Sequence, residues 1–168
     1  ISARLRPVLD EVKRFIDAEI LPLEPEFLAE IDTGGRWSFT ARQLAILEGL
    51  KAKARGRGLW NFFLTEHEGG HGLTTVEYAH IAEETGKSHL APEVFNCSAP
   101  DTGNMEVLVR YGTPAQQERW LKPLLAGEIR SAYVMTEPGV ASSDATNISM
   151  SAVADGDEWV LNGEKIWI

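Results

Sequence analysis

Residues 133–144 read YVMTEPGVASSD, and they stand where the sequence changes from one hydrophobic pattern to another. The residues before Thr136 predict a buried strand over Ser131–Met135, and the Pro, Gly, Ala and Ser residues after it predict a turn. Small residues let backbone N–H groups approach a ligand, and hydroxyl groups add hydrogen-bond donors. The segment therefore suits a cofactor with pyrophosphate oxygens and hydrogen-bonding ring edges. The same residues also fit a strand that ends in an Asx- or ST-type turn, a structure that needs no ligand.

Downstream of this segment, the sequence indicates antiparallel strands. Over residues 148–154, Ile148, Met150 and Ala152 alternate with Ser149, Ser151 and Val153, which predicts a strand. Asp155-Gly156-Asp157 is a predicted turn, and Glu158–Leu161 is the predicted returning strand. The dipeptide Asn162-Gly163 is typical of a two-residue hairpin turn. We therefore expect Lys165–Ile168 to begin a further strand.

Upstream of the segment, the spacing of apolar residues is helical. Apolar periodicity and capping signals predict helices over residues 3–30, 41–57, 75–86, a short stretch from residue 91, 101–111 and 114–127. Pro22 and Pro25 should kink or end the regular part of the first helix. The predicted fold class is α+β, with an all-helical N-terminal domain over residues 1–129 and an antiparallel β region over residues 130–168.

Composition excludes several functional classes. The chain of 168 residues has 16 Lys and Arg against 25 Asp and Glu, so its formal net charge is −9. We expect no nucleic-acid partner, because binding a phosphate backbone needs many cations. We also expect no membrane span, because no apolar run approaches about 18 residues. Because the chain starts at Ile1 and stops at Ile168 within a predicted strand, we expect it to be a piece of a longer protein.

No metal site is predicted. CxxC, HExxH, a Walker loop and a GxGxxG motif after a strand are all missing from the sequence. His67 and His71 have a metal-compatible spacing for a helix, but the two intervening glycines argue against a helix there. Cys97 is the single cysteine, so no intrachain disulfide can form and a reducing compartment is the natural interpretation. We expect Cys97 to be a small buried side chain rather than a nucleophile. The cations between residues 36 and 57 favour a solvated helix face over a surface for anions.

Three strings resemble the flavin-dependent acyl-CoA dehydrogenase family. YVMTEPGVASSDATNI at 133–148 resembles the family signature around T-E-P-G and S-D, and NGEKIWI at 162–168 resembles its N-G-x-K-x-W-I strand. TPAQQERWLKPLLAGE at 113–128 is similar to the helix and G-E turn before the first signature. The resemblance covers the whole chain. The form VASSDATNI looks like the large subgroup that is fused to kinase-like domains in animals.

The resemblance implies a three-domain protein. Its domains are an N-terminal helical domain, an antiparallel β-barrel-like middle domain and a C-terminal four-helix domain, of which this chain would hold the first and the opening strands of the second. The implied cofactor is FAD, and the implied reaction is α,β-dehydrogenation of an acyl-CoA thioester. In this family a base removes the α-proton while hydride leaves the β-carbon for the flavin. That base is a glutamate of the C-terminal domain, so no catalytic residue is assigned here and residues 1–168 alone are expected to be inactive.

The resemblance also assigns binding roles, residue by residue. The implied cofactor-binding residues are Tyr133, Val134, Met135, Thr136, Ser142, Trp167 and Ile168. Met135 and Thr136 are expected at the pyrimidine edge of the flavin, Ser142 at its pyrophosphate, and Trp167 and Ile168 beside its ring system. The implied substrate-binding residues are Ser143, at the CoA portion, and Asn96, at the acyl pocket.

Partners and location are also expectations from the resemblance. We expect electron-transfer flavoprotein as the acceptor, a homodimer or homotetramer, and a role in fatty acid β-oxidation. The location would be the cytoplasm in a bacterium, and mitochondria or peroxisomes in a eukaryote. Two alternatives stay open: a related flavoenzyme such as an acyl-CoA oxidase or a nitroalkane-oxidase-like enzyme, and a non-catalytic helical interaction module.

Overall fold

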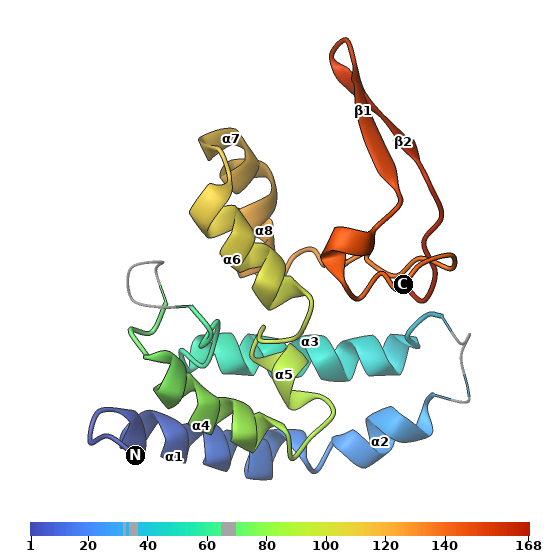
Figure 1. The fold of residues 1–168 in the computed structure, drawn as a ribbon. Coiled ribbons are helices and arrows are strands. Elements are labelled where there is room, and N and C mark those ends of the chain that lie inside the picture. Colours follow the sequence, from blue (N-terminus) through green and yellow to red (C-terminus); the bar gives the residue numbers. More distant parts are fainter. Residues whose placement is uncertain (32, 34–36, 65–69) are drawn as a thin grey trace. The chain divides into compact units, whose positions relative to one another are not determined.

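The computed structural model describes residues 1–31, 33, 37–64 and 70–168 (Figure 1). The chain divides into a helical unit, Ile1–Arg130, and a second unit, Ser131–Ile168, that carries two antiparallel strands. The predicted α+β fold class is therefore confirmed. The predicted domain boundary, between residues 129 and 130, lies one residue before this division.

The described part of the helical unit contains α-helices and two π-helical turns. In chain order the elements are α1 (Leu5–Phe15), η1 (π, Ile16–Ile20), α2 (Glu24–Ala29), α3 (Ala41–Gly56), α4 (Thr75–Thr85), α5 (Ala91–Val94), α6 (Asp101–Tyr111), α7 (Pro114–Gln116), η3 (π, Gln117–Leu121) and α8 (Lys122–Leu125). Thr40, Thr74 and Thr113 each form a capping box, in which the threonine hydroxyl accepts a hydrogen bond from the backbone N–H three residues on. Helices α3, α4 and α7 therefore begin where the sequence predicts.

Both of these π-helical turns end two residues before a proline. The N–H of Leu21 donates to the carbonyl of Ile16 over 2.9 Å, just before Pro22. Likewise, the N–H of Lys122 donates to the carbonyl of Gln117, just before Pro123. Proline has no N–H and its ring collides with the carbonyl four residues earlier, so a wider turn accommodates it. The predicted interruption at Pro22 is therefore observed, because regular helix stops at Ile20 and resumes at Glu24. The predicted helix over 114–127 contains a π-helical turn before Pro123 and ends at Leu125.

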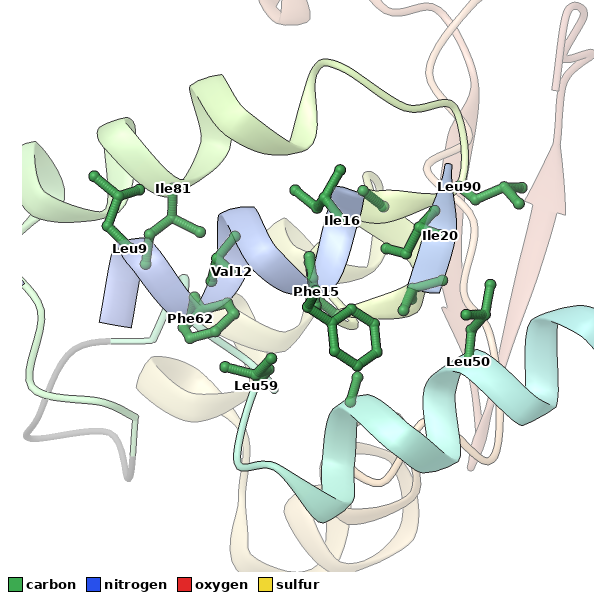
Figure 2. Packing of buried hydrophobic residues seen from close by; sticks show 14 of the residues in the cluster. Leu9, Val12, Phe15, Ile16, Ile20, Leu50, Leu59, Phe62, Ile81 and Leu90 are labelled. Carbon is green, nitrogen blue, oxygen red and sulfur yellow. The ribbon is translucent and has the colours of Figure 1, made fainter. Parts of the chain in front are cut away.

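The main core lies between α1 and the elements packed around it. Apolar side chains of α1 and η1 meet residues of α3, α4 and the connecting segments, among them Leu9, Val12, Phe15, Ile16, Ile20, Leu50, Leu59, Phe62, Ile81 and Leu90 (Figure 2). The rings of Phe15 and Phe62 lie 5.5 and 5.8 Å from the ring of Phe95. Burying a side chain of this size contributes about 1.5–3 kcal/mol, so this cluster dominates the stability of the unit. A second buried cluster comprises Phe63, Leu64, Met105, Leu121 and Leu124.

The second unit contains one β-hairpin, seen at the red end of the chain in Figure 1. Strand β1 (Ser151–Asp155) pairs with β2 (Glu158–Asn162), with Ser151 opposite Asn162 and Asp155 opposite Glu158. The two-residue turn between them starts at Gly156, whose φ of +62° suits glycine. A 3₁₀ turn, η4 (Ala145–Asn147), precedes the hairpin. Among the described residues, no helix is long and apolar enough to cross a membrane.

Three local predictions for this unit are wrong. Residues 131–135 and 165–168 are not strands, and Asn162-Gly163 does not form a hairpin turn, because Asn162 belongs to β2 and has no positive φ. A strand needs a neighbouring ladder of backbone hydrogen bonds. Two hydrogen bonds join these parts of the chain instead: the N–H of Ile166 donates to the carbonyl of Thr136 over 3.0 Å, and Nζ of Lys165 donates to the carbonyl of Met135 over 2.8 Å.

Candidate functional site

The segment before the T-E-P-G turn presents unused hydrogen-bond donors. Tyr133, Val134 and Thr136 are exposed, and Met135 is half-buried. Within the described part of the chain, the backbone N–H groups of Met135 and Thr136 and the hydroxyl of Thr136 have no protein partner. Three donors thus lie on two consecutive residues and are available to a ligand that carries acceptors along one edge.

The turn that follows is closed by its own side chains. The N–H of Glu137 donates to Oγ of Ser142 over 2.8 Å, and Ser142 is 3% exposed. Asp144 accepts hydrogen bonds from the backbone N–H and the hydroxyl of Thr146, at 3.0 and 2.7 Å, and so begins η4. This Asx-type turn is the ligand-free feature that the sequence also allowed. Because Ser142 supports the loop from inside, the exposed Ser143 carries the hydroxyl that is open to a ligand.

Glu137 is the centre of this unit's polar contacts. Its side chain is buried, and Oε2 accepts hydrogen bonds from the N–H and the hydroxyl of Ser149, at 2.8 and 2.7 Å. Its Oε1 accepts from the N–H of Met150 and from Nζ of Lys165, both at 2.9 Å. The hydroxyl of Ser149 and the ammonium of Lys165 lower the pKa of Glu137 to about 2, so the carboxylate is charged at neutral pH.

Lys165 joins this centre to the donor segment. Its Nζ also donates to the carbonyl of Met135 over 2.8 Å. The next residue, Ile166, bonds the carbonyl of Thr136, and Trp167 follows with its side chain 87% exposed and its φ at +59°. The structure therefore joins Met135 and Thr136 to Lys165 and Ile166, the residues that precede Trp167 and Ile168 in the chain, although no strand forms there. Sequence reasoning missed Glu137 and Lys165 as a pair, because they lie 28 residues apart.

Asn96 has a structural environment within the helical unit. It is 7% exposed, and its amide donates to Oδ1 of Asn61 over 2.7 Å and to the carbonyl of Leu124 over 3.0 Å. These bonds satisfy a carbonyl at the end of α8, which a helix leaves without a partner of its own. The Asn96 amide thus has hydrogen-bond partners within the protein and needs no substrate to supply them.

Of the two histidines with metal-compatible spacing, the structure describes only His71. His67 lies outside the described residues. Nε2 of His71 is hydrogen-bonded to the carbonyl of Trp60 over 2.7 Å, and its ring lies 4.7 Å from that of Phe62. Among the residues that the structure describes, no group of three or more His, Cys, Asp or Glu could hold a metal ion.

The remaining candidates from the sequence also have local partners. Burial raises the pKa of the Cys97 thiol to about 11, so it stays protonated at neutral pH and is a poor nucleophile. Cations of α3 pair with glutamates of the first helices: Arg42 with Glu26, and both Lys53 and Arg57 with Glu19. Arg36 lies outside the described residues. Arg42, Lys53 and Arg57 of the cation-rich stretch therefore form ion pairs inside the helical unit.

Known proteins share this sequence at high identity. The family model for the acyl-CoA dehydrogenase N-terminal domain matches residues 2–128. Mouse acyl-CoA dehydrogenase family member 10 is 49% identical over 172 residues, which is 99% of this chain and 16% of that protein. The probable acyl-CoA dehydrogenase FadE2 of Mycobacterium tuberculosis is 57% identical over 123 residues, which is 73% of this chain and 30% of that protein. The chain thus spans less than a third of the length of these relatives.

Solved structures share the fold as well. A candidate acyl-CoA dehydrogenase from Mycobacterium abscessus superimposes with a TM-score of 0.87 and 55% identity, over 98% of this chain and 42% of that one. An acyl-CoA dehydrogenase from Bacillus anthracis, solved in complex with FAD, gives a TM-score of 0.65 at 29% identity, over 99% of this chain and 26% of that one. Together with the family model, these similarities show that the chain belongs to the acyl-CoA dehydrogenase family.

Proposed function

We propose that the intact protein containing this chain is an FAD-dependent acyl-CoA dehydrogenase, which introduces an α,β double bond into an acyl-CoA thioester. The observation that carries the proposal is the row of unpartnered donors on Met135 and Thr136, within a signature of a family in which an FAD complex is known. These donors fit FAD, because the edge of a flavin ring presents acceptors and gains negative charge when the ring is reduced.

Each residue of the segment has a defined part in this proposal. The N–H groups of Met135 and Thr136 and the Thr136 hydroxyl bind and orient the ring edge. Trp167 and Ile168, which are exposed beside this segment, flank the ring and exclude water. When bound, FAD supplies the acceptor for the hydride. Ser143 offers its exposed hydroxyl to the phosphate-bearing part of cofactor or substrate, while Ser142 holds the loop in shape.

The base, the acceptor and the assembly also belong to the proposal. We place the glutamate base outside residues 1–168, so residues 1–168 alone should leave added FAD oxidised in the presence of acyl-CoA. The proposed acceptor is electron-transfer flavoprotein, and the proposed assembly is a homodimer or homotetramer that acts in fatty acid β-oxidation. It would work in the cytoplasm of a bacterium, or in mitochondria or peroxisomes of a eukaryote.

The test is to purify the intact protein, release and identify its flavin, and follow acyl-CoA oxidation with two acceptors. A dehydrogenase should contain about one FAD per chain and pass electrons to electron-transfer flavoprotein much faster than to oxygen. Preferential use of oxygen would instead identify an oxidase on the same scaffold. A protein that binds no FAD would support the non-catalytic interaction module.

A further inference from the structure

The donors on Met135 and Thr136 lie on a segment that is not held by a β-ladder. Residues 131–135 form no strand, and two hydrogen bonds hold the carbonyls of Met135 and Thr136. One is the bond from the N–H of Ile166 to the carbonyl of Thr136, and the other is the bond from Nζ of Lys165 to the carbonyl of Met135. Because a peptide unit is planar, fixing the carbonyl of Met135 also fixes the direction of the Thr136 N–H, which belongs to the same peptide unit.

Lys165 is itself held by Glu137. The lysine side chain is 14% exposed and the glutamate side chain 3%, and Nζ and Oε1 are 2.9 Å apart. The remaining acceptor positions of the carboxylate are filled by Ser149 and Met150, so the carboxylate cannot move to follow a displaced lysine without losing other bonds. A buried pair with its hydrogen bonds satisfied is a rigid support, and removal of either partner leaves an uncompensated charge.

From this geometry we infer that the Glu137–Lys165 pair positions the flavin-edge donors of Thr136 and keeps their surroundings electrically neutral. Both are positioning residues, since neither is assigned a contact with the flavin. The inference rests on the proposed function. It adds the residues that hold the proposed flavin-binding donors in place.

The pair has a property that a merely structural support lacks: its two members carry opposite charges. Lys165→Met leaves the Glu137 charge uncompensated, which should oppose the negative charge that the flavin edge gains on reduction and lower the flavin reduction potential. Glu137→Gln leaves the Lys165 charge uncompensated and should raise that potential. Charges act strongly across a poorly solvated site, so the two shifts should have opposite signs.

The experiment measures the reduction potential and the FAD dissociation constant of the intact protein and its variants. We expect Lys165→Met to lower the potential and weaken FAD binding about tenfold or more, as for loss of a hydrogen bond from a charged group. We expect Glu137→Gln to raise the potential, and Lys165→Arg, which keeps the charge, to lie near the wild type. Lys53→Met is the matched control, because it removes a lysine–glutamate pair of 2.7 Å within the helical unit and should change neither quantity.

Hydrogen exchange of the FAD-free protein gives a readout that needs no flavin. The Ile166 amide should exchange faster in Lys165→Met than in the wild type or in Lys53→Met, at equal thermal stability of the helical unit. Potentials that shift in the same direction in Lys165→Met and Glu137→Gln, or that do not shift, would overturn the inference. So would unchanged exchange at Ile166. Failure of the wild-type protein to bind FAD would contradict the proposed function instead, and the exchange result would still decide whether the pair holds the segment. If Glu137→Gln does not fold, the comparison of Lys165→Met with Lys165→Arg decides. Equal reduction potentials and equal FAD affinities in these two variants would overturn the inference.

Discussion

The side-chain amide of Asn96 donates a hydrogen bond to Oδ1 of Asn61 over 2.7 Å, and both residues have a left-handed backbone, with φ of 53° and 56°. Asn61 donates in turn to the carbonyl of Leu125, and Asn96 donates to that of Leu124. Asparagine tolerates this backbone conformation better than most residues, and its amide supplies the donors. The pair therefore joins two segments of the helical unit to the end of α8.

Asn96→Ala should destabilise the protein by about 2–4 kcal/mol. It removes the hydrogen bonds of the Asn96 amide to Asn61 and to the end of α8, and it places alanine at a positive φ. Urea unfolding of the intact protein checks this. Asn96→Gly is the matched control, because glycine accepts the positive φ, and it should be less destabilising than alanine by about 1 kcal/mol. Wild-type stability combined with weakened acyl-CoA binding would show instead that Asn96 contacts substrate, as the resemblance implied.

Thr136→Val should reduce FAD affinity about 10- to 100-fold, or slow flavin reduction to a similar extent. The change removes one donor aimed at an edge that becomes charged, and such a bond contributes about 1.5–3 kcal/mol. Equilibrium dialysis with FAD and stopped-flow reduction measure the two quantities. Thr136→Ser keeps the hydroxyl and should resemble the wild type. Equal affinity and equal reduction rate in Thr136→Val would remove Thr136 from the site.

The stability contributed by Glu77 should disappear in acid. Its carboxylate accepts hydrogen bonds from Arg4, Ser2 and the N–H of Thr74, and these lower its pKa from 4.5 to about 2. The folded state therefore binds the Glu77 proton less readily than the unfolded state, so the stabilisation is complete above about pH 4.5 and is lost as the pH falls towards 2. The free energy of unfolding of wild type minus that of Glu77→Gln should shrink over this range. A difference that is constant from pH 6 to pH 2.5 would contradict the assignment.

Local signals in the sequence predicted the helix starts well. A capping box needs only a threonine and a Glu or Gln three residues later, so Thr40, Thr74 and Thr113 act at short range and behave as predicted. The π-helical turns before Pro22 and Pro123 were not predicted, because the sequence shows that proline disturbs a helix but not how the helix absorbs it.

Features that depend on distant partners could not be predicted in the same way. The Asn162-Gly163 signal needs a following strand to pair with β2, and the strand signal of residues 131–135 needs a neighbour; neither pairing forms. The motif strings named the segments of the candidate site, but not the contacts that its residues make. Only the structure shows that Ser142 faces into its own loop, and that Glu137 and Lys165 meet behind the donors.

The most direct test of the account is an anaerobic titration of the intact, FAD-loaded protein with acyl-CoA thioesters of different chain lengths, followed by the visible absorbance of the flavin. We predict that at least one thioester bleaches the flavin and yields the α,β-unsaturated product in equal amount, with Thr136→Val bleaching more slowly or retaining less FAD. A protein that holds FAD but stays oxidised with every acyl-CoA, or a protein that holds no FAD at all, would contradict it.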